Sequence, residues 1–116
     1  MYATRHVKQK LDLPMDSISS EIDGILQKIQ NEMFESAKKM LAEKTAKTSE
    51  YSEFKEALEK GSFIDAGWCG RRECEEQIKE DTGADIRVIP FDAGNSGKCV
   101  FCKKDSTTNA IFGRAY

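Results

Sequence analysis

The chain has 116 residues, of which 39% are hydrophobic and 33% are charged, and its formal net charge is −2. This composition predicts one globular domain with a modest core, and the N-terminal residues lack the apolar segment of a secretory signal peptide. No apolar run approaches the roughly 18 residues of a membrane span, and the negative charge argues against a freestanding nucleic-acid-binding domain. We therefore expect a cytoplasmic protein.

Residues 1–14 are predicted to form a linker that precedes a domain over residues 15–116. Charged residues alternate with apolar ones in this short segment, and Pro14 marks its end. His6 is the only histidine of the chain. Because no second histidine or acidic pattern accompanies it, we interpret His6 as an exposed linker residue rather than a metal ligand.

A long amphipathic helix is predicted over about residues 16–44. Asp16 or Ser17 can cap its first turn. Its apolar positions recur at three-, four- and five-residue steps, opposite a charged face. They include Ile18, Ile22, Ile25, Ile29, Phe34, Ala37 and Leu41. At 1.5 Å per residue the helix is about 40 Å long, so we expect its apolar stripe to lie in the core of this domain or against a neighbouring domain.

An α/β region is predicted over about residues 49–116. Residues 45–49 interrupt the helical pattern, and Gly61 and Gly83 suit the ends of two short helices. The expected order is a helix over 51–58, a strand over 63–68, a helix over 73–80, a strand over 85–90 and a final strand over 110–116. Two strands that flank a helix predict a right-handed parallel βαβ unit. The last strand can add to it antiparallel, giving an α+β fold with a long helix and a small mixed sheet.

All four cysteines occur in two close pairs, Cys69 with Cys74 and Cys99 with Cys102. Each pair is short enough to place two sulfurs on one ion, and four thiolates fill a tetrahedral structural zinc site without an open position for water. The alternatives are two disulfides, a redox pair, or four buried thiols. Disulfides require an oxidising compartment, and a redox pair would leave Cys69 and Cys74 unexplained. We favour zinc, which would join the strand–helix junction to a later hairpin.

Five basic residues lie beside the cysteines in the sequence: Arg71, Arg72, Lys98, Lys103 and Lys104. Four thiolates with one divalent ion have a net charge of −2, so we interpret these cations as local neutralisation of the site. Contact with RNA phosphates is the alternative. The chain has no Ser/His/Asp constellation and no phosphate-binding glycine loop, so no catalytic or cofactor-binding residue is assigned.

The segment from Trp68 to Asp92 resembles the C-terminal zinc-binding domain of prolyl-tRNA synthetases of the archaeal and eukaryotic-like type. The resemblance continues through residues 97–102 and 112–116, and it reaches back to about residue 15. It implies that the zinc ligands are Cys69, Cys74, Cys99 and Cys102. Members of the family often have glycine immediately after the fourth cysteine, where this chain has Lys103. A lysine at positive φ costs about 1 kcal/mol there, which leaves the shape of this turn open.

The resemblance also implies a longer parent enzyme. A class II catalytic domain would attach proline to its tRNA using ATP bound outside this chain, and an anticodon-binding domain would end at residues 1–14. The parent enzyme would be a homodimer, and this fragment alone would be catalytically inert. We expect the domain to pack on the catalytic core and stabilise it, with the terminal carboxylate of Tyr116 as a docking group. The alternatives are a tRNA-contacting module and a freestanding zinc-knuckle adaptor for protein interactions.

Overall fold

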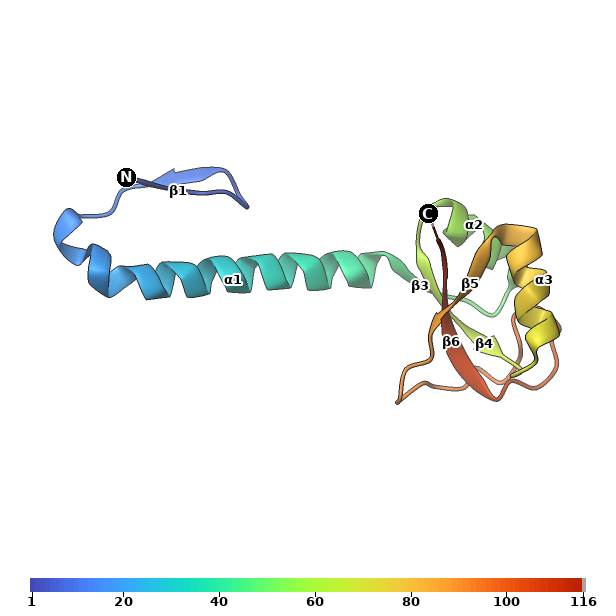
Figure 1. Ribbon diagram of the computed structural model, residues 1–116. Coiled ribbons are helices and arrows are strands. Elements are labelled where there is room, and N and C mark those ends of the chain that lie inside the picture. The colour runs from blue at the N-terminus through green and yellow to red at the C-terminus, as the bar shows by residue number, and fades with distance from the viewer. Residues whose placement is uncertain (116) are drawn as a thin grey trace. The chain divides into compact units, whose positions relative to one another are not determined.

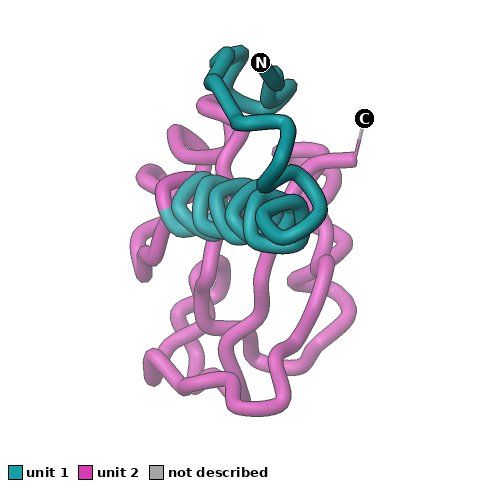
Figure 2. The backbone as a smooth tube through the Cα atoms, turned by 90° about the vertical axis from the view of Figure 1, so that its left-hand side faces the viewer, with its two compact units in different colours: residues 1–42 teal, residues 43–116 magenta. Residues whose placement is uncertain are grey.

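The structure is a computed structural model that describes residues 1–115, and its backbone forms two compact units, Met1–Ala42 and Glu43–Tyr116 (Figure 2). The first unit contains a hairpin, a short turn of 3-10 helix and most of a long helix (Figure 1). Its elements are β1 (Tyr2–Thr4), β2 (Gln9–Leu11), η1 (Met15–Ser17) and α1 (Ile18–Glu43).

Residues 1–14 contain more regular structure than a simple linker. β1 pairs antiparallel with β2, with Tyr2 opposite Leu11. The prediction of an exposed His6 is wrong, because only 12% of its side chain is exposed and its Nε2 atom pairs with the carboxylate of Glu32 in α1. The assignment of residues 1–14 to the end of another domain stays a prediction.

The long helix was predicted with nearly correct limits, and α1 begins two residues later than expected because η1 precedes it. No residue of α1 is buried within the described part of the chain. The side chains of Leu26, Phe34 and Leu41 are 58%, 60% and 58% exposed. The apolar stripe is therefore not the core of this domain. No helix within residues 1–115 is long and apolar enough to cross a membrane.

The second unit combines helices with one four-stranded sheet. Together with the long helix of the first unit, this confirms the predicted α+β class. Its elements are β3 (Thr45–Lys47), α2 (Tyr51–Glu59), β4 (Phe63–Trp68), α3 (Arg72–Thr82), β5 (Ala84–Val88) and β6 (Thr108–Arg114). The strand order is β3-β4-β6-β5, with β3 parallel to β4 and β6 antiparallel to both of its neighbours (Figure 1). The sheet is therefore mixed.

The strand order differs from the simplest βαβ arrangement in two ways. First, β6 lies between β4 and β5, so the two strands that flank α3 are not adjacent. Burial explains this order, because Ala110 and Phe112 of β6 are fully buried whereas β5 is half exposed and suits an edge. Second, residues 45–47, expected to interrupt the pattern, form β3. A directly adjacent βαβ unit thus runs through β3, α2 and β4.

One face of the sheet and both short helices share the core. Alternation along β4 and β6 places Ile64, Ala66, Ala110 and Phe112 on the same face, where they cluster with residues of α2 and α3. The rings of Phe54 and Phe112 meet edge to face, with their centroids 5.2 Å apart. This packing fixes the end of β4 and the start of α3, which carry the first cysteine pair.

The two short helices end as their glycines predicted. Gly61 follows Lys60, the C-cap residue of α2, with φ +75°, and Gly83 caps α3 with φ +74°. The left-handed conformation costs glycine no steric penalty, so these residues allow the chain to leave each helix and enter the next strand.

Candidate metal centre

The four cysteines come from two separate parts of the second unit. Cys69 directly follows β4 and Cys74 lies in the first turns of α3, whereas Cys99 and Cys102 lie in the long connection between β5 and β6. Their four Sγ atoms all lie within 4.8 Å of one another. The fold therefore brings together two pairs of thiols that are distant in the sequence.

The distances agree with tetrahedral thiolate coordination. A tetrahedral site with metal–sulfur bonds of about 2.3 Å has sulfur–sulfur edges of about 3.8 Å. The Sγ atoms of Cys69 and Cys74 are 3.5 Å apart, and all four cysteines are free thiols. Convergence of all four sulfurs fits one metal ion, whereas a redox pair would require only two of them. The cluster is thus able to hold a metal ion.

Backbone turns of the same kind follow the two partly exposed cysteines. Gly70 after Cys69 has φ +79°, and Lys103 after Cys102 has φ +58°. In each turn the next backbone N–H donates to the preceding sulfur, from Arg71 to Cys69 and from Lys104 to Cys102. Lys103 therefore adopts the positive φ that the family's glycine would allow at this position. The turn keeps its shape and supplies amide donors to the sulfurs.

The four thiols differ in their acidity. Burial raises the pKa of the Cys69 thiol, but hydrogen bonds from Arg71 and from the thiols of Cys74 and Cys102 oppose it and lower the pKa to about 6. Burial raises the pKa of Cys74 and Cys99, which are 5% and 0% exposed. Two buried thiols become good ligands only when a cation compensates their charge. This donor set therefore fits a bound metal ion.

The basic residues near the cysteines have different partners. The Arg71 Nη2 atom lies 3.6 Å from the Sγ atom of Cys102. Arg72 pairs with Glu76 at 2.7 Å, and Lys98 pairs with Asp105 at 2.7 Å. Lys103 donates to the Ser49 carbonyl, and Lys104 is exposed. Within residues 1–115, Arg71 is the member of this group whose side chain is seen against a sulfur.

Comparison with known proteins identifies the family. The family described as "Prolyl-tRNA synthetase, C-terminal" matches residues 51–116, which include all four cysteines. The chain belongs to this family. The resemblance expected from the cysteine-containing segment is thereby confirmed.

Relatives match beyond the limits of that family segment. A proline–tRNA ligase of Cenarchaeum symbiosum is 40% identical over 114 residues, which cover 98% of this chain and 24% of that protein. Proline–tRNA ligase 2 of Clostridioides difficile is 39% identical over 118 residues, covering 100% of this chain and 24% of the relative. The chain thus spans about a quarter of the length of these curated relatives.

A solved structure shows the same fold. The prolyl-tRNA synthetase from Cryptosporidium parvum, complexed with L-proline and AMP, matches with a TM-score of 0.89 and 29% identity. The match covers 98% of this chain and 25% of that one.

Two contacts at the centre were not predicted from the sequence. The indole Nε1 of Trp68 donates to the Arg71 carbonyl at 3.2 Å, which fixes the turn between the first two cysteines. Val100 N–H donates to the Gly67 carbonyl at 2.9 Å, which joins the second pair to β4. The Trp-Cys order is a weak signal for the first contact. No sequence signal indicates the second, because backbone groups make it.

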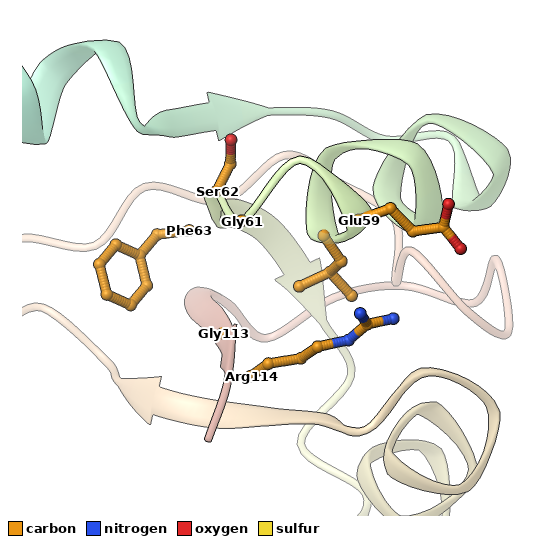
Figure 3. A pocket seen from close by; sticks show the side chains of 7 residues that line it. Glu59, Gly61, Ser62, Phe63, Gly113 and Arg114 are labelled. Carbon is orange, nitrogen blue, oxygen red and sulfur yellow. The ribbon is translucent and has the colours of Figure 1, made fainter. Parts of the chain in front are cut away.

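A small pocket lies at the opposite end of β4 from Cys69. It is lined by Leu58, Glu59, Gly61, Ser62, Phe63, Gly113 and Arg114, with Glu59 and the Arg114 guanidinium toward one end and Phe63 at the other (Figure 3). Its volume of about 190 Å³ is below the roughly 300–1,000 Å³ of typical small-molecule sites. Arg114 Nε donates to the Thr82 carbonyl at 2.7 Å, a contact that holds β6 to the end of α3. The proposed docking residue Tyr116 lies outside the described residues.

Proposed function

We propose that this chain is the C-terminal structural zinc-binding domain of a proline–tRNA ligase. Cys69, Cys74, Cys99 and Cys102 would hold one zinc ion. The observation that carries this proposal is the convergence of all four thiols within 4.8 Å, in a chain of the prolyl-tRNA synthetase C-terminal family. Zinc bound by four thiolates acts as a cross-link between chain segments and has no position for a reacting water.

The cysteines would stabilise the second unit by joining its two halves. Cys69 and Cys74 belong to the junction of β4 and α3, and Cys99 and Cys102 belong to the loop that precedes β6. Structural zinc contributes an apparent 10–16 kcal/mol in small zinc-binding peptides, roughly as much as the 5–15 kcal/mol net stability of a typical domain. We therefore expect folding of residues 43–116 to depend on the metal.

The reaction would take place elsewhere in the parent enzyme. That enzyme would attach proline to its tRNA using ATP, and its catalytic and anticodon-binding domains would be the partners of this one. We propose a cytoplasmic enzyme, because reducing conditions keep four free thiols available for metal. We propose that it is a homodimer only because the family resemblance implies it. Arg72 and Lys98 are paired with carboxylates, which supports a structural role for the domain over contact with tRNA phosphates.

Metal analysis combined with a thiol count tests the proposal. The purified chain is expected to contain one zinc ion, and its four thiols should resist a thiol reagent until a chelator is added. Re-addition of zinc should restore the protection. Four freely reactive thiols in metal-saturated protein would contradict the proposal.

The contribution to the parent enzyme can be tested in the complete ligase. Cys99→Ala is expected to shorten the half-life of aminoacylation activity on heating, with little change in KM for proline, because the proposed role is structural. A large change in KM with unchanged heat resistance would argue against that role.

A further inference from the structure

Arg71 connects the two halves of the cysteine cluster. Its backbone N–H donates to the sulfur of Cys69, and its guanidinium Nη2 lies 3.6 Å from the sulfur of Cys102. Its carbonyl is held at 3.2 Å by the indole of Trp68. Arg71 thus contacts one sulfur from each cysteine pair, and the hydrogen bond from Trp68 fixes its backbone.

The charge of the centre gives this contact a role. Four thiolates with one divalent ion have a net charge of −2, and Cys102 is one of the two partly exposed ligands. Groups that hydrogen-bond to metal ligands orient them and commonly change metal affinity by about 10- to 100-fold when removed. A guanidinium is suited to this role because it keeps its charge and offers several donors in a fixed plane.

We propose that Arg71 is a positioning residue of the metal centre, whose guanidinium neutralises part of the charge on the sulfurs and shields Cys102. This inference rests on the proposed zinc site. The neutralising role that the sequence suggested for five basic residues is thereby assigned to Arg71 alone. Three of the other basic residues face carboxylates instead, since Arg72 pairs with Glu76, Lys98 with Asp105 and Lys103 with Glu50. Lys104 is exposed, and no contact of its side chain with a sulfur is seen within the described residues.

The chain offers a matched control at the next position. Arg72 begins α3 directly after Arg71, has the same charge, and pairs with Glu76 at 2.7 Å instead of contacting a sulfur. Arg71→Ala and Arg72→Ala therefore remove the same charge at almost the same place. Only Arg71→Ala removes the contact with Cys102.

Zinc affinity is measured first, by competition with a chromophoric chelator on the full chain. Arg71→Ala is expected to bind zinc about tenfold more weakly than the wild type, and Arg72→Ala should stay within about twofold. The difference between the two variants should shrink in high salt, because Arg71 is exposed and its charge is screened. Equal affinities for both variants would overturn the inference.

Cobalt substitution supplies a readout that a purely structural role would not move. The sulfur-to-cobalt charge-transfer band reports the electron density on the sulfurs, and loss of a hydrogen bond raises that density. We expect the band to shift to lower energy in Arg71→Ala and to stay in place in Arg72→Ala. An unshifted band in Arg71→Ala would overturn the contact with Cys102.

A second variant covers the case in which Arg71→Ala does not fold. Arg71→Lys keeps the charge but loses the planar set of donors, so we expect roughly threefold weaker zinc binding and a shifted cobalt band. Wild-type values in both measurements would overturn the inference. If the wild-type chain binds no zinc, both this inference and the proposed function fail. If it binds one zinc and the Arg71 variants match the wild type, only this inference fails.

Discussion

The ammonium nitrogen of Lys103 lies 2.6 Å from the carbonyl oxygen of Ser49 and 3.3 Å from a carboxylate oxygen of Glu50. Lys103 also has φ +58°, a conformation that costs a non-glycine residue about 1 kcal/mol or more. Its side chain thus ties the second cysteine pair to the turn before α2. This contact offsets part of the cost of placing lysine where the family often has glycine.

Substitutions of Lys103 separate these two effects. Lys103→Ala loses the contact and keeps the strained backbone, whereas Lys103→Gly loses the contact and relieves the strain. We expect the alanine variant to be less stable than the glycine variant by about 1 kcal/mol in urea unfolding of the metal-loaded chain. Lys104→Ala, at an exposed neighbouring position, should be nearly neutral. Equal stability of the alanine and glycine variants would show that φ at this position is not strained.

Gly67 is predicted to tolerate no side chain. A Cβ atom there would lie 2.2 Å from the Lys98 carbonyl oxygen and 2.7 Å from the Ser96 hydroxyl, because the loop before the second cysteine pair crosses β4 closely. We expect Gly67→Ala to lower the free energy of unfolding by about 3 kcal/mol and to weaken metal binding. Gly24→Ala is the control, since a Cβ in α1 meets nothing within 4 Å and alanine favours the helix. Wild-type stability of Gly67→Ala would mean that the loop does not lie against β4.

Tyr51 is predicted to make the protein sensitive to alkaline pH. Burial, the 3.0 Å hydrogen bond to Asp81 and the charge of Asp81 raise the pKa of Tyr51 well above its usual range. The folded state then holds this proton more tightly than the unfolded chain, in which tyrosine ionises near about pH 10. The resulting stabilisation is complete below about pH 10 and is lost as the pH rises above that value.

A phenolate absorbance titration measures this effect directly. Tyr51 should ionise late, after the onset of alkaline unfolding in other probes. Tyr51→Phe should remove the late phase, and Asp81→Asn should move it toward the ordinary pKa of tyrosine. A wild-type titration with no late phase that Tyr51→Phe removes would contradict the prediction.

Removal of the metal is expected to affect the two units differently. All four proposed ligands lie in the second unit, after residue 62, and none lies in α1. A chelator should therefore abolish hydrogen-exchange protection in β4 and β6 before it affects α1, because metal binding and folding of this unit are coupled. Loss of protection in α1 first, or in both regions together, would indicate that the ligands do not control the second unit alone.

Local patterns predicted most elements and the candidate site. Gly61 and Gly83 marked the ends of α2 and α3 correctly, and the spacing of Cys69 with Cys74 indicated a shared ion without any knowledge of the sheet. The short strand β3 was not predicted, because three residues carry no periodicity and its pairing with β4 depends on α2 folding between them. His6 was misinterpreted because its partner Glu32 is 26 residues away.

The sequence by itself determined the three α-helices, the strands β4, β5 and β6, the family and the four cysteines that converge, because periodicity, glycine turns and ligand spacing act within a few residues. Only the tertiary structure decided that β6 lies between β4 and β5, since burial of Phe112 against Phe54 depends on the packing of the whole sheet. It also decided which cation contacts a sulfur. Five basic residues are near the cysteines in the sequence. In the folded chain Arg72 and Lys98 pair with carboxylates, whereas the guanidinium of Arg71 lies against the sulfur of Cys102.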